Sequence, residues 1–399
     1  MATVNMFKTL VKGRITNLSL KIDNEVRRRC LDMNKHALFS TKPPSGGREG
    51  KRSWRFAMGS LGLGVAAGAG YAYYNTPAPP KAILNDEKSN KRLLLDKLPE
   101  LSPARKVVSV VDHTGLDLVL YQYPTCPFCC KVRAFLDYYG FSYSVIEVNP
   151  VLRQQIKWSE YKKVPILLAK VENVYQQMND SSVIISALTT YLHDQHQNLS
   201  DILNFYPSVS FTEDGGKVKT EVMNRYFLMF QDSMPLGRTN EALGEERKWR
   251  KWADEVLVHT LSPNVYRTFD ESLQSFKWFS EVGEWERLFP AWECYLIVYL
   301  GALAMWAIGK RLKKRHHLKD DVRQSLYDEC NHWMRQLNKK GSHFMGGDSP
   351  NLADLAVYGV LSSISGCEAF KDLLNHTKIG TWYGRMKSAV ESHSGRMMP

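Results

Sequence analysis

Residues 126–129, Cys-Pro-Phe-Cys, constrain the fold of this 399-residue chain more than any other stretch. They follow a strand-like run at 116–123 and open a helical run that ends at Gly140. A strand that leads directly into a helix puts the first cysteine at the helix N-terminus, where free backbone N–H groups and the helix dipole stabilise a thiolate. We therefore expect Cys126 to be nucleophilic.

The neighbours of Cys126 extend this expectation. Lys131 and Arg133 bring positive charge close to the thiol, and Cys129, one helical turn further on, is placed to act as a resolving thiol. We expect the adjacent Cys130 to be a buried core residue, which is the commonest role of a free cysteine.

Other roles for the cysteine cluster fit less well. Zinc would need a second pair of ligands, and the 11 histidines are scattered without a suitably spaced pair. A structural disulfide across so short a loop would constrain little of the unfolded chain. The seven cysteines are odd in number and mostly far apart. We therefore expect a thiol-reducing compartment and no metal site.

Residues 105–200 have the pattern of an α/β domain in the order β-α-β-α-β-β-α. Hydrophobic runs bounded by turn residues predict the strands, and amphipathic runs with capping residues predict the helices. Besides 116–123, the expected strands are 142–148, 164–171 and 174–178, and the expected helices are 126–140, 149–161 and 179–192.

The second half of the chain has a helical pattern. Residues 201–244 read as a connecting segment with a hairpin that turns at 214–216. Residues 245–395 show helical periodicity throughout, and Asn351 with Asp354 forms a variant of the capping box. Two apolar stripes mark expected core faces: Trp249, Trp252, Ala253, Val256, Leu257 and Leu261, then Val322, Leu326, Cys330, Trp333 and Leu337.

The N-terminal part differs in composition from everything after it. Residues 1–55 carry 13 Lys and Arg against 4 Asp and Glu, so most of the formal charge of +12 lies there and the rest is close to neutral. A nucleic-acid partner is therefore not expected. Residues 56–75 contain no charged side chain and are long enough to cross a bilayer. We expect a membrane-anchor helix there, rather than a flexible Gly/Ala-rich linker, followed by a charged linker at 76–104.

A second apolar run, 294–309, precedes the basic segment KRLKKRHH. The run is slightly short for a membrane span, whereas a central bundle helix is apolar on every side. We therefore expect a core helix of the helical domain. The basic segment would attach weakly to anionic lipid, so that residues 101–399 form a soluble dimer released from membranes by salt.

Three features together fit glutathione. Val164 precedes Pro165, and a cis proline there would leave the backbone of Val164 free to pair with an extended peptide. Asp180 and Ser181 open a helix, where backbone N–H groups and hydroxyls bind a carboxylate. By themselves these two residues would read as simple caps. With Cys126 they predict a site for the glutathione sulfur, backbone and γ-glutamyl carboxylate.

The motifs resemble two known families. "YPTCPFC", "KVP" and "NDSS" are similar to the glutathione-binding elements of glutaredoxins, and "GGDSPNLADLAVYG" is similar to a glutathione-transferase C-terminal domain. Together with the membrane-like N-terminus, the chain from about 105 onward resembles the membrane-associated prostaglandin E synthases of type 2. The implied fold is an α/β thioredoxin-like (glutaredoxin-type) domain followed by an all-α domain.

The resemblance also implies a function, the isomerisation of prostaglandin H2 to prostaglandin E2 with Cys126 as the essential thiol. It implies glutathione as cofactor and a homodimer. It also implies a haem-bound form that breaks the substrate down, in which the iron is ligated through the glutathione sulfur. The implied location is a single-pass Golgi membrane protein with catalytic domains facing the cytosol, released in a cleaved soluble form; a mitochondrial address is the alternative. The implied site residues are Tyr123 (catalytic), Phe128, Val164, Pro165, Asp180 and Ser181.

Two other functions stay open. A glutaredoxin-type thiol-disulfide oxidoreductase would use Cys129 as a resolving thiol, whereas isomerisation needs only Cys126. A non-catalytic membrane protein that binds glutathione or haem would show ligand affinity without turnover.

Overall fold

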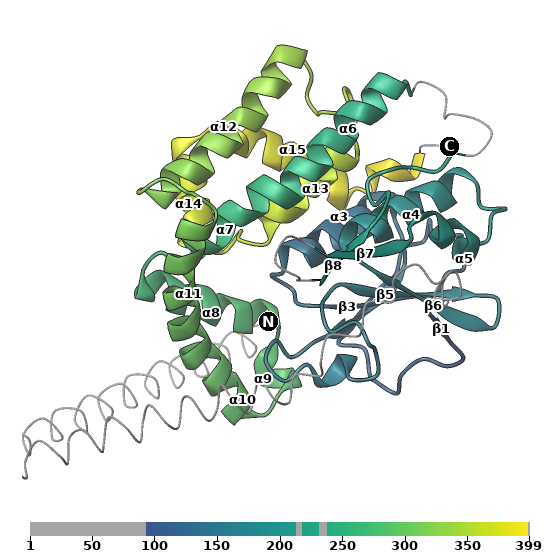
Figure 1. Cartoon of the computed structure of the whole chain (residues 1–399), viewed down its shortest axis with the longest axis horizontal. Coiled ribbons are helices and arrows are strands. Elements are labelled where there is room, and N and C mark those ends of the chain that lie inside the picture. The colour runs from purple at the N-terminus through teal and green to yellow at the C-terminus, as the bar shows by residue number, and fades with distance from the viewer. Residues whose placement is uncertain (1–92, 213–217, 231–237, 398–399) are drawn as a thin grey trace, which may run out of the picture. The chain divides into compact units, whose positions relative to one another are not determined.

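A computed structural model describes residues 93–212, 218–230 and 238–397 (Figure 1). The basic segment 1–55, the membrane span 56–75 and most of the linker expected at 76–104 lie outside these residues.

The first part is a mixed six-stranded sheet in the order β1-β6-β5-β3-β4-β2. β3 and β4 are parallel and the other neighbouring strands are antiparallel. The prediction of a thioredoxin-like α/β domain is confirmed. The strands are β1 (Leu94–Leu95), β2 (Arg105–Val107), β3 (Leu118–Gln122), β4 (Tyr143–Glu147), β5 (Ile166–Val171) and β6 (Val174–Asn179).

The two edge strands are additions that the sequence pattern does not predict. β1 and β2 have only two and three residues, too few for a visible alternation of apolar and polar side chains. β1 pairs with β6 although it lies in the expected linker, and β2 pairs with β4.

The helix expected at 149–161 is wrong. Asn149 does cap the backbone N–H groups of Val151 and Leu152, as a helix start would require. Arg153 then adopts a positive φ of 50°, which a right-handed helix does not allow. Only the 3₁₀ turn η2 (Gln154–Ile156) follows.

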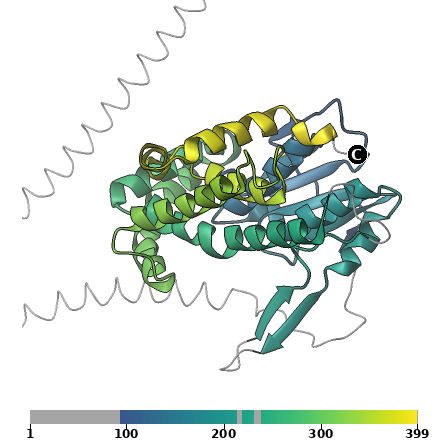
Figure 2. The same cartoon turned by 90° about the horizontal axis from the view of Figure 1, so that it is seen from above.

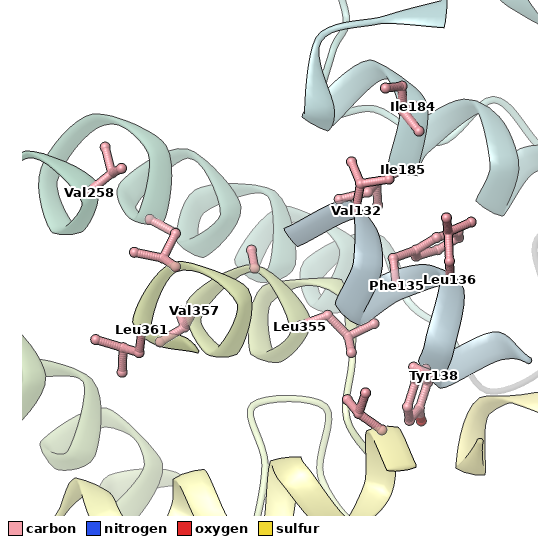
Figure 3. Close-up of a cluster of buried hydrophobic side chains, with 14 of the residues drawn as sticks. Val132, Phe135, Leu136, Tyr138, Ile184, Ile185, Val258, Leu355, Val357 and Leu361 are labelled. Carbon is pink, nitrogen blue, oxygen red and sulfur yellow. The ribbon is translucent and has the colours of Figure 1, made fainter. Parts of the chain in front are cut away.

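Two helices cover the sheet and carry the candidate site residues. α3 (Pro127–Tyr139) begins after Cys126, and α4 (Ser181–His193) begins after Asp180. Their buried side chains meet in one core, in which Val132, Phe135 and Leu136 of α3 lie near Ile184 and Ile185 of α4 (Figure 3).

A short linking region follows the sheet. The helical turns α5 (Leu199–Ile202) and η3 (Leu203–Phe205) lead into an antiparallel hairpin, β7 (Ser208–Thr212) with β8 (Val218–Val222). The hairpin projects from the helices in Figure 2. The predicted strands of the hairpin are confirmed, and its turn at 214–216 lies outside the described residues.

The remaining chain is helical, so the predicted all-α domain is confirmed. The capping box of Asn351 and Asp354 is present at the start of α13. The elements are α6 (Asn240–Trp252), η4 (Ala253–Leu257), α7 (Val258–Val265), α8 (Phe269–Val282), α9 (Trp285–Leu288), α10 (Ala291–Tyr295), η5 (Leu296–Leu300), α11 (Gly301–Arg315), α12 (Val322–Lys340), α13 (Leu352–Ser362), α14 (Glu368–His376), α15 (Ile379–Glu391) and η6 (Ser394–Met397).

The predicted stripe of α12 is buried throughout, but the stripe after residue 249 is only partly buried. Val256 is 39% exposed, whereas Ala253 and Leu257 are completely buried. The segment η4 is a π-helix, which holds more residues per turn than an α-helix. The wider turn rotates Val256 away from the face that α-helical spacing predicts.

The two domains share a close helix–helix contact between α3 and α13. Gly359 of α13 lies against the backbone of Cys130 and Lys131, with no room for a Cβ atom. Leu355 of α13 points toward α3, on the side where Phe135 lies (Figure 3). The helix that carries the cysteines is therefore packed between the sheet and the helical domain.

The run 294–309 is helical, but the expectation of a helix buried on every side is wrong. It belongs to a continuous helix, Ala291–Arg315, of which only 28% of the most apolar 18-residue window is buried. Within the described residues it is the one helix long and apolar enough to span a bilayer. It packs on α8 by one side, where Gly301 lies against Phe276 and Ser272 donates to the carbonyl of Ala302.

Candidate active site around Cys126

Cys126 occupies the N-cap position of α3 and is half-buried. Its own N–H donates to the carbonyl of Tyr123, and its carbonyl accepts from Cys130 N at 2.9 Å. Pro127 fills the first helical position, where a missing N–H costs no hydrogen bond. The first thiol therefore lies at a helix N-terminus, as the sequence predicts.

The surroundings of Cys126 lower its pKa. The largest contribution is a hydrogen bond from the Cys129 thiol, followed by the backbone N–H groups of Cys129 and Phe128 and the charge of Arg133, while burial opposes them. Its own burial, and after it the same contact, raise the pKa of Cys129 well above its usual value. Of the two thiols, Cys126 is therefore the one that ionises first, and Cys129 stays the hydrogen-bond donor.

The two basic residues after the cysteines have different roles. Arg133 acts on Cys126, as expected. Lys131, in contrast, is completely buried and pairs with Asp254 at 2.5 Å, so the expectation that it adds charge beside the thiol is wrong. Helical geometry explains the difference, since residues 131 and 133 point to different sides of α3.

Arg133 belongs to a buried chain of polar contacts behind the cysteines that sequence reasoning missed. Its guanidinium donates to Gln122 Oε1 and to the carbonyl of Pro124, both at 2.6 Å. Gln122 donates in turn to Glu147 at 2.8 Å. Because Pro124 lies two residues before Cys126, these contacts fix the loop that presents the thiol.

Cys130 is buried, as predicted. Its thiol donates to the carbonyl of Pro124 and accepts from Arg133, and burial raises its pKa. It therefore takes part in holding the loop, and its raised pKa disfavours a second nucleophile.

Several aromatic side chains lie near Cys126. The Tyr123 hydroxyl is buried, and among the described residues only the Arg153 guanidinium, itself a donor, interacts with it, so the hydroxyl proton has no acceptor. Burial raises the pKa of Tyr123, with the charge of Arg153 opposing. Tyr161 and Tyr266, both half-buried, are near enough to sense the charge of Cys126, which helps raise both pKa values after the larger effect of burial. Phe128 is half-buried and lies 5.8 Å from Lys131 Nζ.

The expected glutathione-binding residues lie on the loop before β5 and at the start of α4. The Val164–Pro165 peptide is cis, and Val164 lies before the first paired residue of β5, Ile166. Asp180 caps α4 by accepting from the N–H groups of Ser182 and Val183. Arg225, from the segment after the hairpin, lies 3.6 Å from Asp180 and was not among the predicted site residues.

Ser181 and Ser182 contact the buried ion pair. Lys131 Nζ donates to Ser181 Oγ at 3.4 Å and to Ser182 Oγ at 3.2 Å. Ser182 Oγ donates to Asp254 at 2.7 Å, and the Tyr226 hydroxyl donates to the same carboxylate at 3.1 Å. This network joins α3, α4 and η4, and no sequence motif indicated it.

In the described part of the chain, no group of three or more His, Cys, Asp or Glu residues is arranged to hold a metal ion.

Comparison with known proteins agrees with this description. The glutaredoxin family model matches residues 118–172. Similar solved structures include glutathione S-transferase III in apo form (13% identity, TM-score 0.39, covering 71% of this chain and 97% of that chain) and FzlA from C. crescentus (16% identity, TM-score 0.37, covering 69% and 90%). The family match and the fold described above define the class: a thiol protein with a glutaredoxin-type sheet domain and an additional helical domain.

Curated relatives narrow this class. The chain is 50% identical over 294 residues to Prostaglandin E synthase 2 of Mus musculus, covering 73% of this chain and 75% of the relative. It is 50% identical over 280 residues to Prostaglandin E synthase 2 of Danio rerio, covering 70% and 72%. The chain belongs to the prostaglandin E synthase 2 family.

Proposed function

We propose that this chain isomerises prostaglandin H2 to prostaglandin E2. Its membership of the prostaglandin E synthase 2 family supports the reaction type. The observation that carries the proposal is the thiol of Cys126, whose pKa is lowered at the N-terminus of α3.

The reaction needs one nucleophile and two proton transfers. The Cys126 thiolate attacks the endoperoxide oxygen on the ring carbon that becomes the ketone. The weak O–O bond breaks, and the other oxygen takes up a proton and becomes the hydroxyl. Loss of the proton on the first ring carbon then forms the carbonyl, breaks the S–O bond and returns the thiolate. One proton is taken up and one released, so there is no net oxidation.

Tyr123 is the proposed proton donor to the leaving oxygen. Burial raises its pKa, which keeps the phenol protonated at neutral pH. Its hydroxyl is free to donate to a ligand. The aromatic faces of Phe128 and Tyr266 would line the apolar path for the lipid tails, between the sheet domain and the helical domain.

Glutathione is the proposed second ligand, and its binding is consistent with the glutaredoxin domain. The backbone of Val164, before Pro165, would pair with the cysteinyl residue. The N-terminus of α4, at Asp180 and Ser181, would hold the γ-glutamyl carboxylate. The bound sulfur would lie next to Cys126.

A haem-bound form is also proposed, with the iron ligated through the glutathione sulfur. Phe128 lies two positions after Cys126, and Tyr266 is near enough to sense its charge, so the two aromatic rings would form part of a site for a flat ring. Titration of the chain with hemin, with and without glutathione, tests this directly. We expect a Soret band shift that requires glutathione, and the same spectrum in both titrations would contradict it.

Turnover of prostaglandin H2 by the full chain, with the products identified, tests the main proposal. We expect wild-type chain to form prostaglandin E2 and Cys126→Ser to be inactive. Cys294→Ser is the matched control, because it removes a thiol on α10 instead. Activity of Cys126→Ser close to wild type would refute the role of this thiol. Glutathione binding without turnover by wild-type chain would favour a non-catalytic binding protein.

Disulfide reduction is the second candidate function, and the contact between Cys129 and Cys126 favours it. Cys129→Ser separates the two, because serine keeps a hydroxyl donor to Cys126 but cannot form a disulfide. We expect this variant to retain isomerase activity and to lose dithiol-dependent disulfide reduction. Loss of both activities would show that the two functions need the same dithiol.

We also propose a homodimer, supported by the exposed face of the helix Ala291–Arg315. Several large apolar side chains on it are exposed, and the basic side chains of Lys310, Arg311, Lys314 and Arg315 follow them. Near the other end, a cleft of ≈ 530 Å³ is lined by three glutamates, two basic residues and two tyrosines: Glu281, Glu284, Glu286, Lys277, Arg287, Tyr295 and Tyr299. Arg287 pairs with Glu284. An antiparallel two-fold pair would bring each basic end beside Glu281 and Glu286 of the second copy. The exposed apolar residues are Trp292, Tyr295, Leu296, Tyr299, Leu300, Leu303 and Ile308.

Light scattering of wild-type chain and a Leu300→Glu, Leu303→Glu variant tests this surface. We expect the variant to be monomeric, with Leu374→Glu on α14 as a control that stays dimeric. A variant that stays dimeric would place the interface elsewhere.

We propose that the N-terminal span, residues 56–75, anchors the chain in a Golgi membrane, with the catalytic domains facing the cytosol. A mitochondrial address is the alternative. The test is to cleave the chain after the span and to wash the membranes with high salt. If the cleaved chain is released, helix Ala291–Arg315 lies outside the bilayer. A cleaved chain that only detergent extracts would show that this helix inserts.

A further inference from the structure

The buried ion pair between Lys131 and Asp254 lies directly behind the proposed glutathione site. Lys131 is 1% exposed and follows the cysteines on α3. Asp254 comes from the π-helix η4 of the other domain, an irregular geometry that is frequent at functional sites. A charged pair removed from water gains little net stability, so a role in stability alone explains it poorly.

The hydrogen-bond chemistry of this pair determines what the two serines can do. A lysine ammonium has only donors, whereas a hydroxyl both donates and accepts. Ser182 Oγ accepts from Lys131 and gives its own proton to Asp254. Ser181 Oγ also accepts from Lys131, so its proton is available to a different acceptor.

That available proton lies at the N-terminus of α4, where the γ-glutamyl carboxylate is proposed to bind. We propose that Lys131 and Asp254 are positioning residues: the pair fixes the Ser181 hydroxyl as a donor to this carboxylate. The inference rests on the proposed glutathione function and adds to it. Glutathione affinity then depends on the helical domain, which contributes no residue to the predicted glutathione contacts.

Further contacts hold the network at the same place. Arg250 of α6 donates to the carbonyl of Ser182 at 3.2 Å and to Ser186 Oγ at 2.8 Å. Arg250 is also buried. The start of α4 is therefore tied to α6 and η4 by two independent side chains, and a shift of this helical segment would move the carboxylate site.

Calorimetric titration of the full chain with two peptides tests the proposal. One is glutathione, and the other carries 4-aminobutyryl in place of γ-glutamyl, so that it lacks only the α-carboxylate. We expect Lys131→Met and Ser181→Ala to weaken glutathione binding about tenfold, the effect of one lost hydrogen bond to a charged group. The analogue should bind wild type and both variants equally.

Controls separate positioning from a general structural effect. Lys170→Met, which changes an exposed lysine on β5, should change neither affinity. The pH dependence of Cys126 alkylation should stay unchanged in Lys131→Met, because Arg133 supplies the charge that acts on this thiol. If Lys131→Met does not fold, Lys131→Met with Asp254→Leu removes the unpaired charge and takes its place.

The outcomes are distinguishable. If wild-type chain does not bind glutathione, the proposed glutathione site fails and this inference fails with it. If wild type binds but the variants bind glutathione equally well, only the positioning role is refuted. Equal weakening of glutathione and the analogue would show a structural effect and would also refute it.

Discussion

Replacement of Gly359 by alanine should destabilise the chain through the contact between α13 and α3. A Cβ atom at this position would lie 2.5 Å from Lys131 Cα and 2.6 Å from Lys131 N. Both are backbone atoms, so no side-chain rotation relieves the overlap. Carbon atoms in contact sit about 3.5–4.0 Å apart, so the two helices must separate by roughly 1 Å.

The size of the effect follows from two opposing contributions. Alanine in a helix is about 1 kcal/mol more favourable than glycine. Overpacking of a core typically costs about 1–3 kcal/mol, and a clash between two backbones lies at the upper end. We therefore expect Gly359→Ala to lower the free energy of unfolding by about 2 kcal/mol.

Gly384→Ala is a matched control for this prediction. Gly384 lies in α15, and a Cβ atom there would meet no atom within 4 Å. Only the helix propensity then applies, so this variant should be more stable than wild type by up to about 1 kcal/mol. The two glycine-to-alanine changes should thus have opposite signs.

Urea unfolding of the full chain, followed by tryptophan fluorescence, measures both variants in one buffer. A Gly359→Ala midpoint equal to or above that of wild type would refute the reasoning. Because the same separation would move Lys131 from Asp254, the variant should also bind glutathione more weakly.

The remaining predictions concern ionisable groups. Cys129→Ala removes the hydrogen bond that contributes most to the lowered pKa of Cys126, so alkylation of Cys126 at neutral pH should slow about tenfold or more, whereas Cys129→Ser should react nearly as fast as wild type. Arg133→Met should also slow this alkylation, because it removes the positive charge and frees the loop; an unchanged rate would contradict the contacts described for Arg133. Burial raises the pKa of Asp354 from 3.8 to about 6, so its favourable contribution to folding, fully present below 3.8, is lost as the pH rises through about 6. Relative to Asp354→Asn, the free energy of unfolding of wild type should therefore rise by at most about 3 kcal/mol when the pH is lowered from 7 to 4, as measured by urea unfolding. A difference between the two proteins that does not change with pH would show that this carboxyl does not titrate in that range.

The local features of the site could be predicted from the sequence because they depend on neighbours along the chain. The position of Cys126 at a helix N-terminus follows from a strand run, a Pro at the first helical position and an amphipathic run within 25 residues. The capping box of Asn351 and Asp354 likewise spans only four positions. Such hydrogen bonds and periodicities depend only on residues close together in the chain, so they could be predicted from the sequence pattern.

The patterns along the chain mispredicted two segments, whose structure depends on a local backbone conformation in one case and on tertiary packing in the other. The helix expected at 149–161 stops because Arg153 adopts a left-handed conformation, which no composition rule indicates. The apolar run 294–309 predicted a buried helix, but burial depends on how many elements pack around it, and only one side is covered.

The contacts behind the site depended on tertiary structure alone. Lys131 reads as one more positive charge beside the thiol, yet its partner Asp254 is 123 positions away. The sequence by itself determined the thiol, its helix and the family. Only the packing of α3 between the sheet and the helical domain decided which charge acts on Cys126 and which one faces Ser181, because opposite sides of one helix face different partners.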